Sequence, residues 1–371
     1  MEKYKNMKFR KRANLKMIRN FVFFILLIVF TFWYIFKDQD LNELKKVVEG
    51  ANKWYVLAGF ILMLGSYTME SINIRSILIS LGEKKFSILR AIKYTSSGAF
   101  FSAITPGSTG GQPAEVYYMS KDNIKTTNGT LAMLMELCAF QISSILLSII
   151  CGILNPDLLK DGIVWFYILG IVVNGCALTG MLLGMFSKKI TQKFVNFVVK
   201  VMKKAKVKGY EAKKIKIEEG FHQYVESAKY IKENKMVFVK SILRVFIQVV
   251  LFHSIPYFIY RSFGLNELSY LKLFSMQAVL YTTVAAIPVP GSIGVSETLF
   301  MKLYGIAFTT ALISGAMLLF RFVSFYIYIV IFSVVVIINA TKSKNIESEI
   351  DKNVKEVEKD FDQEEKLVYS N

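Results

Sequence analysis

Long apolar blocks alternate with short polar connections along most of the chain. Most blocks have about the twenty residues that a helix needs to cross a hydrocarbon core of about 30 Å. This pattern predicts an all-α polytopic membrane protein. The blocks are residues 21–36, 54–80, 88–104, 131–154, 163–186, 236–260, 271–287 and 311–340.

The polar connection at residues 187–235 fixes the orientation. It holds fourteen lysines and five glutamates, a net charge of +9, and positively charged loops stay in the cytoplasm. Eight basic residues and one acid precede the first block, which places the N-terminus in the cytoplasm too. No small-residue cleavage site follows that block, so we interpret it as an uncleaved span. Apolar residues among the lysines at 194–201 predict either an amphipathic surface helix or a solvated loop.

Counting the crossings leaves two segments that begin and end on one side of the membrane. Residues 88–127 start and finish in the cytoplasm, and residues 262–309 start and finish outside. Glycine- and proline-rich breaks interrupt both segments, at 105–111 and at 288–294. We therefore predict about six full spans plus two re-entrant broken-helix hairpins of opposite orientation, which is typical of an inverted repeat.

This reading divides the chain into five regions. They are a basic cytoplasmic N-terminus (1–20), a first membrane half (21–186), a basic cytoplasmic loop (187–235), a second membrane half (236–340) and a charged cytoplasmic tail (341–371).

The two breaks share a short sequence pattern. Residues 106–110 and 290–294 are identical at four of five positions, and a glutamate follows each, Glu115 and Glu297. A broken helix in a membrane is tolerated inside protein or beside a watery cavity. Glycine permits close approach, and the free N–H groups of the second half-helix favour an anion such as a lipid phosphate. The alternative is a simple hairpin turn in a packed bundle.

Ionisable residues inside the apolar blocks are the second indication of function, because each is costly when it faces lipid. Arg75 and Arg244 either face the interior or extend to the membrane surface, and we expect His253 to be a hydrogen-bonded interior residue, with a proton relay as the alternative. Glu136 and Arg321 either form a structural ion pair or meet a head group. The predicted head-group site comprises Pro106, Gly107, Ser108, Gly110, Gly111, Glu115, Glu136, Pro290, Gly291, Ser292, Gly294, Glu297 and Arg321.

We expect β-branched residues at Gly110 or Gly294 to block the approach of the lipid if the backbone there is left-handed.

The composition of the chain excludes several other classes of protein. The chain is 53% hydrophobic, its formal net charge is +18, and its mean hydropathy is +0.41. The positive charge lies between apolar blocks, so it indicates membrane topology and an anionic inner leaflet rather than nucleic-acid binding. The three cysteines lie in apolar stretches without a CxxC motif, which argues against a disulfide framework and a zinc site. We predict no catalytic residues, no metal and no cofactor.

The runs Thr105-Pro-Gly-Ser-Thr-Gly-Gly-Gln-Pro-Ala-Glu115 and Ile287-Pro-Val-Pro-Gly-Ser-Ile-Gly-Val-Ser-Glu297 resemble the two signature loops of the lysylphosphatidylglycerol synthase transmembrane family. The family includes the flippase half of the multiple peptide resistance factor, also called phosphatidylglycerol lysyltransferase. The resemblance implies translocation of aminoacylated phosphatidylglycerol in a bacterial cell membrane, with protection against cationic antimicrobial peptides.

Several alternatives stay open beside this lipid flippase-like function. Full-length relatives carry a C-terminal aminoacyltransferase domain, and the chain ends about thirty residues after its last block, so we expect no lysyl transfer from tRNA by this chain alone. The alternatives are a phosphatidylglycerol lysyltransferase by family label, a polyprenyl-phosphate or glycolipid transporter, and a scaffold that recruits a synthase. The expected partners are a membrane phospholipid and a separate lipid synthase, with the oligomeric state left open.

Overall fold

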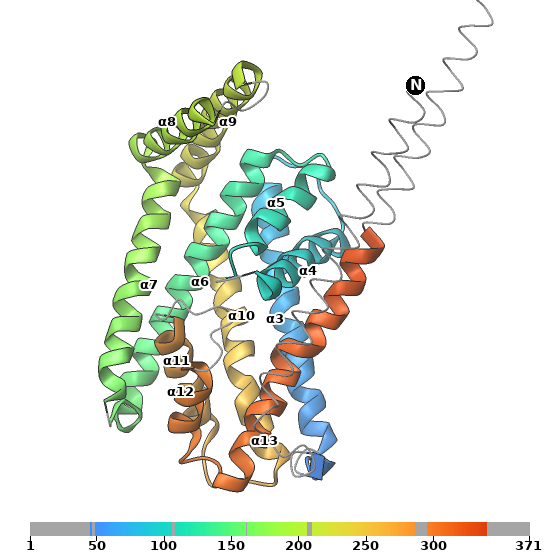
Figure 1. The fold of residues 1–371 in the computed structure, drawn as a ribbon, viewed down its shortest axis with the longest axis vertical. Helices are drawn as coiled ribbons and strands as arrows, with labels where there is room; N and C mark the ends of the chain where they lie inside the picture. Colours follow the sequence, from blue (N-terminus) through green and yellow to red (C-terminus); the bar gives the residue numbers. More distant parts are fainter. Residues whose placement is uncertain are drawn as a thin grey trace, which may run out of the picture.

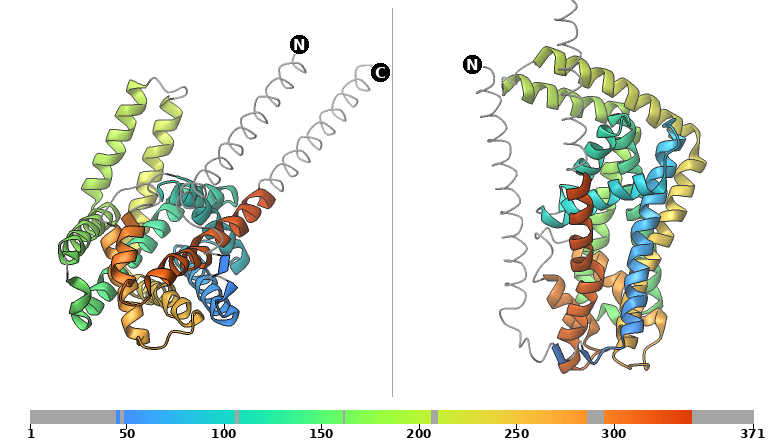
Figure 2. Two further views of the ribbon diagram at one scale, coloured as in Figure 1. Left: turned by 60° about the horizontal axis from the view of Figure 1, so that its bottom comes forward. Right: turned by 90° about the vertical axis from the view of Figure 1, so that its right-hand side faces the viewer.

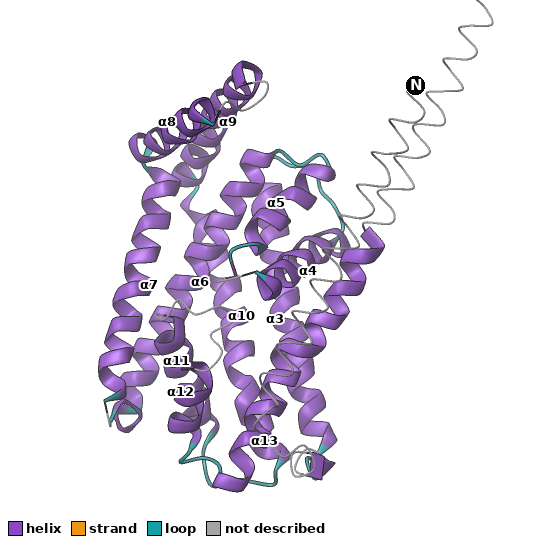
Figure 3. Ribbon diagram, viewed as in Figure 1, coloured by secondary structure: helices purple, strands orange, loops and turns teal. Residues whose placement is uncertain are grey.

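The computed structural model describes residues 45–46, 49–105, 108–160, 162–205, 210–285 and 295–339. Within these residues the regular structure is helical, with eleven α-helices and no strands (Figure 3). The all-α prediction is confirmed for this part of the chain. The predicted first span at 21–36 and the predicted tail at 341–371 lie outside the described residues.

Five helices are long and apolar enough to cross a membrane, and they run along the long axis of the molecule (Figure 1). Five of the six predicted full spans are therefore present, and the chain is a multi-pass membrane protein. The last of them begins as α13 (Thr310–Arg321) and contains a π-helical turn at Phe322–Tyr326. The five are α3 (Lys53–Ser80), α6 (Thr126–Leu154), α7 (Ile163–Phe186), α10 (Lys235–Ser262) and the span Thr310–Asn339.

Local sequence sets where these helices begin and end. The Asn52 side chain caps α3 by accepting a hydrogen bond from the Trp54 N–H at 3.0 Å, as N-cap residues do. Gly82 follows the end of α3 with a φ of +87°, a conformation that glycine adopts without steric cost. Ser87 then caps α4 (Ile88–Ile104) by accepting from the Arg90 N–H at 3.3 Å.

Two pairs of shorter helices complete the bundle. The pair α4 and α5 (Gly111–Lys121) lies in the half of the molecule that carries α8 (Lys188–Lys204) and α9 (Tyr210–Glu233) (Figure 1). The pair α11 (Tyr270–Ala285) and α12 (Val295–Tyr304) lies in the opposite half. The break predicted between α11 and α12 falls at residues outside the described part of the chain.

The basic connection forms a helical hairpin that extends sideways from one end of the bundle (Figure 2). α8 is the predicted amphipathic helix. Phe194 and Phe197 leave 65% and 62% of their surface exposed, and Ile190 and Val201 are also exposed. These four residues follow helical spacing and form an apolar stripe among lysines, which we call the α8 apolar face.

Close backbone approaches hold the two membrane halves together. Small residues allow such approaches where the hydrophobic effect between helices is weak. Gly170 of α7 faces α11 so closely that a Cβ there would lie 2.3 Å from the Thr282 carbonyl oxygen. The Ser66 hydroxyl of α3 donates to the Gln248 carbonyl of α10 at 3.1 Å. The Tyr328 hydroxyl of the last span donates to the Phe60 carbonyl at 2.7 Å.

Candidate functional site

The turn between α4 and α5 is organised by the Thr105 hydroxyl. It donates to the Phe101 carbonyl at 2.7 Å and accepts from the Gly110 N–H at 2.8 Å. Ser108 has a left-handed φ of 56°, whereas Gly110 is right-handed with a φ of −83°. The left-handed position that was considered for Gly110 therefore belongs to Ser108. Gly110 serves close packing, because a Cβ there would lie 2.6 Å from the Thr105 Cγ2 atom.

α5 presents two different faces to its surroundings. One face packs inside the bundle through Gly111, Glu115 and Met119, all buried. A Cβ at Gly111 would lie 2.0 Å from the Ser102 Oγ atom of α4, so glycine permits the tight contact between the two arms. Pro113 lies in the first turn of α5, where its missing N–H costs no helical hydrogen bond.

The other face of α5 borders a groove of about 470 Å³. α6 forms its second wall, and the Glu115 side chain is not among the groove residues. Most of the lining is apolar, with polar groups from both helices. The lining consists of Gln112, Pro113, Val116, Tyr117 and Ser120 on α5, and Thr126, Thr130, Met133, Leu134 and Leu137 on α6.

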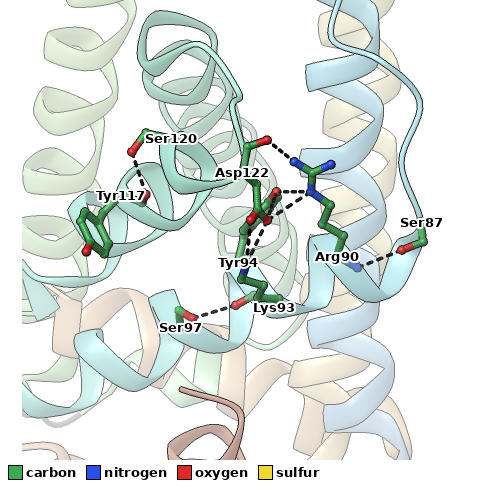
Figure 4. Close-up of polar contacts among 8 residues, drawn as sticks. All are labelled: Ser87, Arg90, Lys93, Tyr94, Ser97, Tyr117, Ser120 and Asp122. Carbon is green, nitrogen blue, oxygen red and sulfur yellow. Dashed lines mark hydrogen bonds and ion pairs between the residues drawn. The ribbon is translucent and has the colours of Figure 1, made fainter. Parts of the chain in front are cut away.

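Asp122, directly after α5, ties α4 and α5 together (Figure 4). Lys93 donates to both carboxylate oxygens of Asp122 at 2.9 Å, and the Tyr94 hydroxyl donates to Oδ2 at 2.8 Å. Arg90 donates from Nε to Oδ2 at 3.1 Å and from Nη2 to the Asp122 carbonyl. We call these four residues the Asp122 clamp.

Electrostatics favours the ionised form of Asp122. Partial burial raises the pKa of the carboxyl, but the hydrogen bonds from Lys93 and Tyr94 and the charges of Lys93 and Arg90 outweigh it. The net pKa lies below the ordinary value, as expected for a carboxylate between cations.

A second polar group lies inside the bundle, where α3, α5, α6 and α10 meet. The Asn73 amide donates to Glu136 and, at 2.9 Å, to the Ser241 hydroxyl. The Gln248 amide donates to Glu70 at 3.5 Å. Glu115 and Glu136 are buried, and Glu115 interacts electrostatically with both Glu136 and Glu70. We call Glu70, Glu115 and Glu136 the carboxylate cluster.

The structure brings some of the predicted site residues together and separates others. Glu115 and Glu136 are close enough to interact, and Ser108, Gly110 and Gly111 lie at the turn that leads into α5. Glu136 accepts from Asn73 through Oε2, and its Oε1 has no partner among the described residues, so the structure shows no ion pair between Glu136 and Arg321, which lies at the end of α13. The structure does not describe Pro106, Gly107, Pro290, Gly291, Ser292, Gly294 or the side chain of Glu297.

Two other ionisable residues of the apolar blocks, Arg75 and His253, have different surroundings. Arg75 donates from Nε to the Phe86 carbonyl at 2.6 Å, which gives it a structural role. His253 is buried among the rings of Phe252, Phe274 and Tyr281. The expectation that His253 is hydrogen-bonded is wrong, because neither ring nitrogen has a partner among the described residues. Its aromatic neighbours fill the space that a polar partner would need.

The Asp122 clamp and the two interior amides were missed in the sequence. Arg90 and Lys93 stand three residues apart at the start of one arm, and Asp122 stands at the end of the other. Opposite charges at the two ends of the predicted re-entrant segment are the signal that could have revealed the clamp. Asn73 and Gln248 carry no such signal, because single amides in apolar blocks have no spacing pattern.

Among the described residues, no group of His, Cys, Asp and Glu side chains is arranged to hold a metal ion. The sequence model of one protein family, described as the lysylphosphatidylglycerol synthase TM region, matches residues 21–331. No curated protein matches the chain.

Proposed function

Because the chain belongs to the lysylphosphatidylglycerol synthase TM family, we propose that it is a flippase-like protein of a bacterial cell membrane. Its substrate would be aminoacylated phosphatidylglycerol or a related phospholipid. The observation that carries the proposal is the broken pair α4–α5, with a groove on one face of α5 and buried carboxylates on the other. A lipid needs both an apolar surface for its chains and polar groups for its head.

The groove between α5 and α6 suits an acyl chain. A narrow apolar channel buries the chain, and burial of each CH₂ group stabilises the complex by about 0.8 kcal/mol. Gln112, at the start of α5, lines the same groove. The first N–H groups of a helix lack helical partners and attract anions, so we assign the phosphate to the turn at 105–111.

The second broken pair supports an inverted repeat. α11 and α12 lie in the half of the bundle opposite α4 and α5 (Figure 1). In such repeats the broken helices meet near the membrane midplane, where the substrate binds. We propose that Glu297, Arg321 and the glycines at 291 and 294 contribute the head-group contacts from this second pair.

Filling the groove tests the proposal directly. Thr130 lines the groove, and its hydroxyl donates to the carbonyl four residues earlier. Thr179 on α7 makes the same local bond but is exposed outside the groove. Thr130→Trp should therefore block lipid movement, whereas Thr179→Trp should leave it unchanged. The measurement is dithionite bleaching of fluorescent phosphatidylglycerol in proteoliposomes that contain the purified protein.

Each outcome of these experiments contradicts a different part of the proposal. Bleaching of inner-leaflet lipid that is no faster than in protein-free liposomes contradicts the proposed function. Equal rates in the two tryptophan variants contradict the groove as the path. Arg321→Gln and Glu136→Gln, alone and together, then test the head-group assignment. Full translocation by the double variant would remove both residues from the site.

A further inference from the structure

The carboxylate cluster lies deep in the membrane region of the bundle. Glu70 precedes the end of α3 at Ser80 by ten residues, and Glu136 follows the start of α6 at Thr126 by ten residues. At 1.5 Å per residue, both lie about 15 Å from those helix ends. This is about half the thickness of a hydrocarbon core of about 30 Å. Glu115 reaches the same region from α5 and interacts with both.

The cluster has more hydrogen-bond acceptors than donors. Glu115 Oε2 and Glu136 Oε1 are buried and have no partner among the described residues. The amide oxygens of Asn73 and Gln248 are also buried without a hydrogen-bond partner among the described residues. Only 0% of Asn73 and 6% of Gln248 are exposed. Their NH₂ groups point into the cluster, toward Glu136 and Glu70. A buried acceptor that has no hydrogen-bond donor destabilises the folded protein.

Within the part of the chain that the structure describes, no cation pairs with the three carboxylates. Among the described residues none of them forms a salt bridge, and Arg90 and Lys93 of α4 are held by Asp122. Glu70 interacts with Tyr67 on its own helix, and Tyr67 interacts with Tyr328 of the last span. The other titratable groups on α3, α5, α6 and α10 are Lys53, Tyr55, Arg75, Tyr117, Tyr118, Lys121, Cys138, Cys151, Lys235, Lys240, Arg244, His253, Tyr257, Tyr260 and Arg261.

Glu115 and Glu136 are buried, and Glu70 is half-buried. An ionised carboxylate buried without a cation is expensive, and neighbouring ionised carboxylates repel one another. A proton removes one charge and supplies one donor, and it needs no cavity. A metal ion would need a preformed set of ligands, and the described His, Cys, Asp and Glu side chains offer none. The chemistry of the cluster therefore matches a proton better than a metal cation.

We propose that Glu70, Glu115 and Glu136 form a proton-binding site in the membrane interior that couples proton uptake to the movement of the lipid. Uptake forms one O–H bond on a carboxylate oxygen and consumes one proton from water; release reverses this step. The coupling rests on the proposed function, but the proton-binding site itself does not.

α5 connects the proton site to the groove. Glu115 packs against α4 at Gly98, where an added Cβ would lie 2.0 Å from Glu115 Oε1. Gln112, Val116 and Tyr117 line the groove from the other face of the same helix. A neutral carboxyl can stay in this dry contact, whereas an ionised one draws water and displaces α5 from α4. The protonation state of Glu115 therefore sets the width of the groove.

Infrared difference spectroscopy of the purified full-length protein in liposomes tests the proton site without any lipid transport. We expect an absorption band of protonated carboxyl groups that changes in a pH titration and loses intensity in Glu115→Gln and Glu136→Gln. Glu219→Gln, on the exposed surface of α9, should leave the band unchanged. A band that is the same in wild type and both interior variants overturns the proposal, as does a change caused by Na⁺ at constant pH.

Lipid movement under an imposed pH gradient tests the coupling in the same liposomes. We expect the bleaching rate of fluorescent phosphatidylglycerol to depend on the direction of the gradient in wild type and in Glu219→Gln. Glu115→Gln should remove this dependence. A bleaching rate that does not depend on the direction of the gradient contradicts the coupling, but it does not contradict the proposed function. If the infrared band of protonated carboxyl groups is present but no lipid moves, the proposed function is contradicted and the proton-binding site is not.

Discussion

Gly98 of α4 and Glu115 of α5 share one small space: a Cβ on Gly98 would lie 2.0 Å from Oε1 and 2.4 Å from Cγ of Glu115. Real Cβ atoms do not approach other atoms so closely. The contact exists because residue 98 has no side chain, and it places a carboxyl group against a helix backbone inside the bundle.

Gly98→Ala should therefore destabilise the protein by about 1–3 kcal/mol, the usual cost of overpacking. Gly175→Ala on α7 is the matched control, because nothing lies within 4 Å of its added Cβ. The measurement is thermal unfolding in detergent. Glu115→Ala removes the clashing atoms, so the double variant with Gly98→Ala should recover part of the loss. Additive losses in the double variant contradict the contact.

Asp122→Asn should weaken the clamp between α4 and α5. Because the groups are partly exposed, we expect a loss of about 1–2 kcal/mol at neutral pH. The pKa of Asp122 is lower in the folded protein than its ordinary value, which is about 3.9. Its stabilising contribution is therefore present above that value and disappears as the pH falls through the lowered folded pKa.

Thermal unfolding of wild type and Asp122→Asn should accordingly differ at neutral pH and converge in strong acid. Glu226→Gln, at an exposed position of α9, should match wild type throughout. A difference between wild type and Asp122→Asn that persists unchanged in strong acid would show that the carboxylate charge is not the cause.

The α8 apolar face should lie in the cytoplasmic surface of the membrane. Exposed phenylalanines beside lysines favour an anionic lipid surface. Nitroxide labels on cysteines at Phe194 and Phe197 should be accessible to oxygen dissolved in lipid. Labels at Lys193 and Lys200, on the same helix, should be accessible to a water-soluble relaxation agent. Equal accessibility at all four positions rules out this location.

The orientation of the bundle can be measured with single cysteines in a cysteine-free background. Lys204, at the end of α8, and Asn266, between α10 and α11, are exposed. The charge pattern places the first in the cytoplasm and the second outside. A membrane-impermeant reagent added to intact cells should label only Asn266→Cys. Labelling of Lys204→Cys from outside would invert the topology.

Sequence periodicity predicted the helices well because length and hydropathy are local properties. The block at 88–104 coincides with α4 (Ile88–Ile104), and the block at 163–186 coincides with α7 (Ile163–Phe186). The Pro-Gly run after residue 105 marked the break before α5 correctly, since glycine and proline disfavour a continuous helix.

The polar interior was harder to predict because its contacts join distant parts of the chain. Asn73 and Glu136 are 63 residues apart, and Gln248 and Glu70 are 178 residues apart. No spacing rule connects such pairs; they follow from how α3, α6 and α10 pack. Burial of Glu136 was anticipated from its cost in lipid, but its partner Asn73 was not.

The contact between Gly170 and the Thr282 carbonyl sets how closely α7 and α11 can pack. With no side chain at residue 170, the two helices approach backbone to backbone, although they are separated by three other helices along the chain. Any larger residue at position 170 would therefore have to push α7 away from α11, and the loss would be felt by both helices.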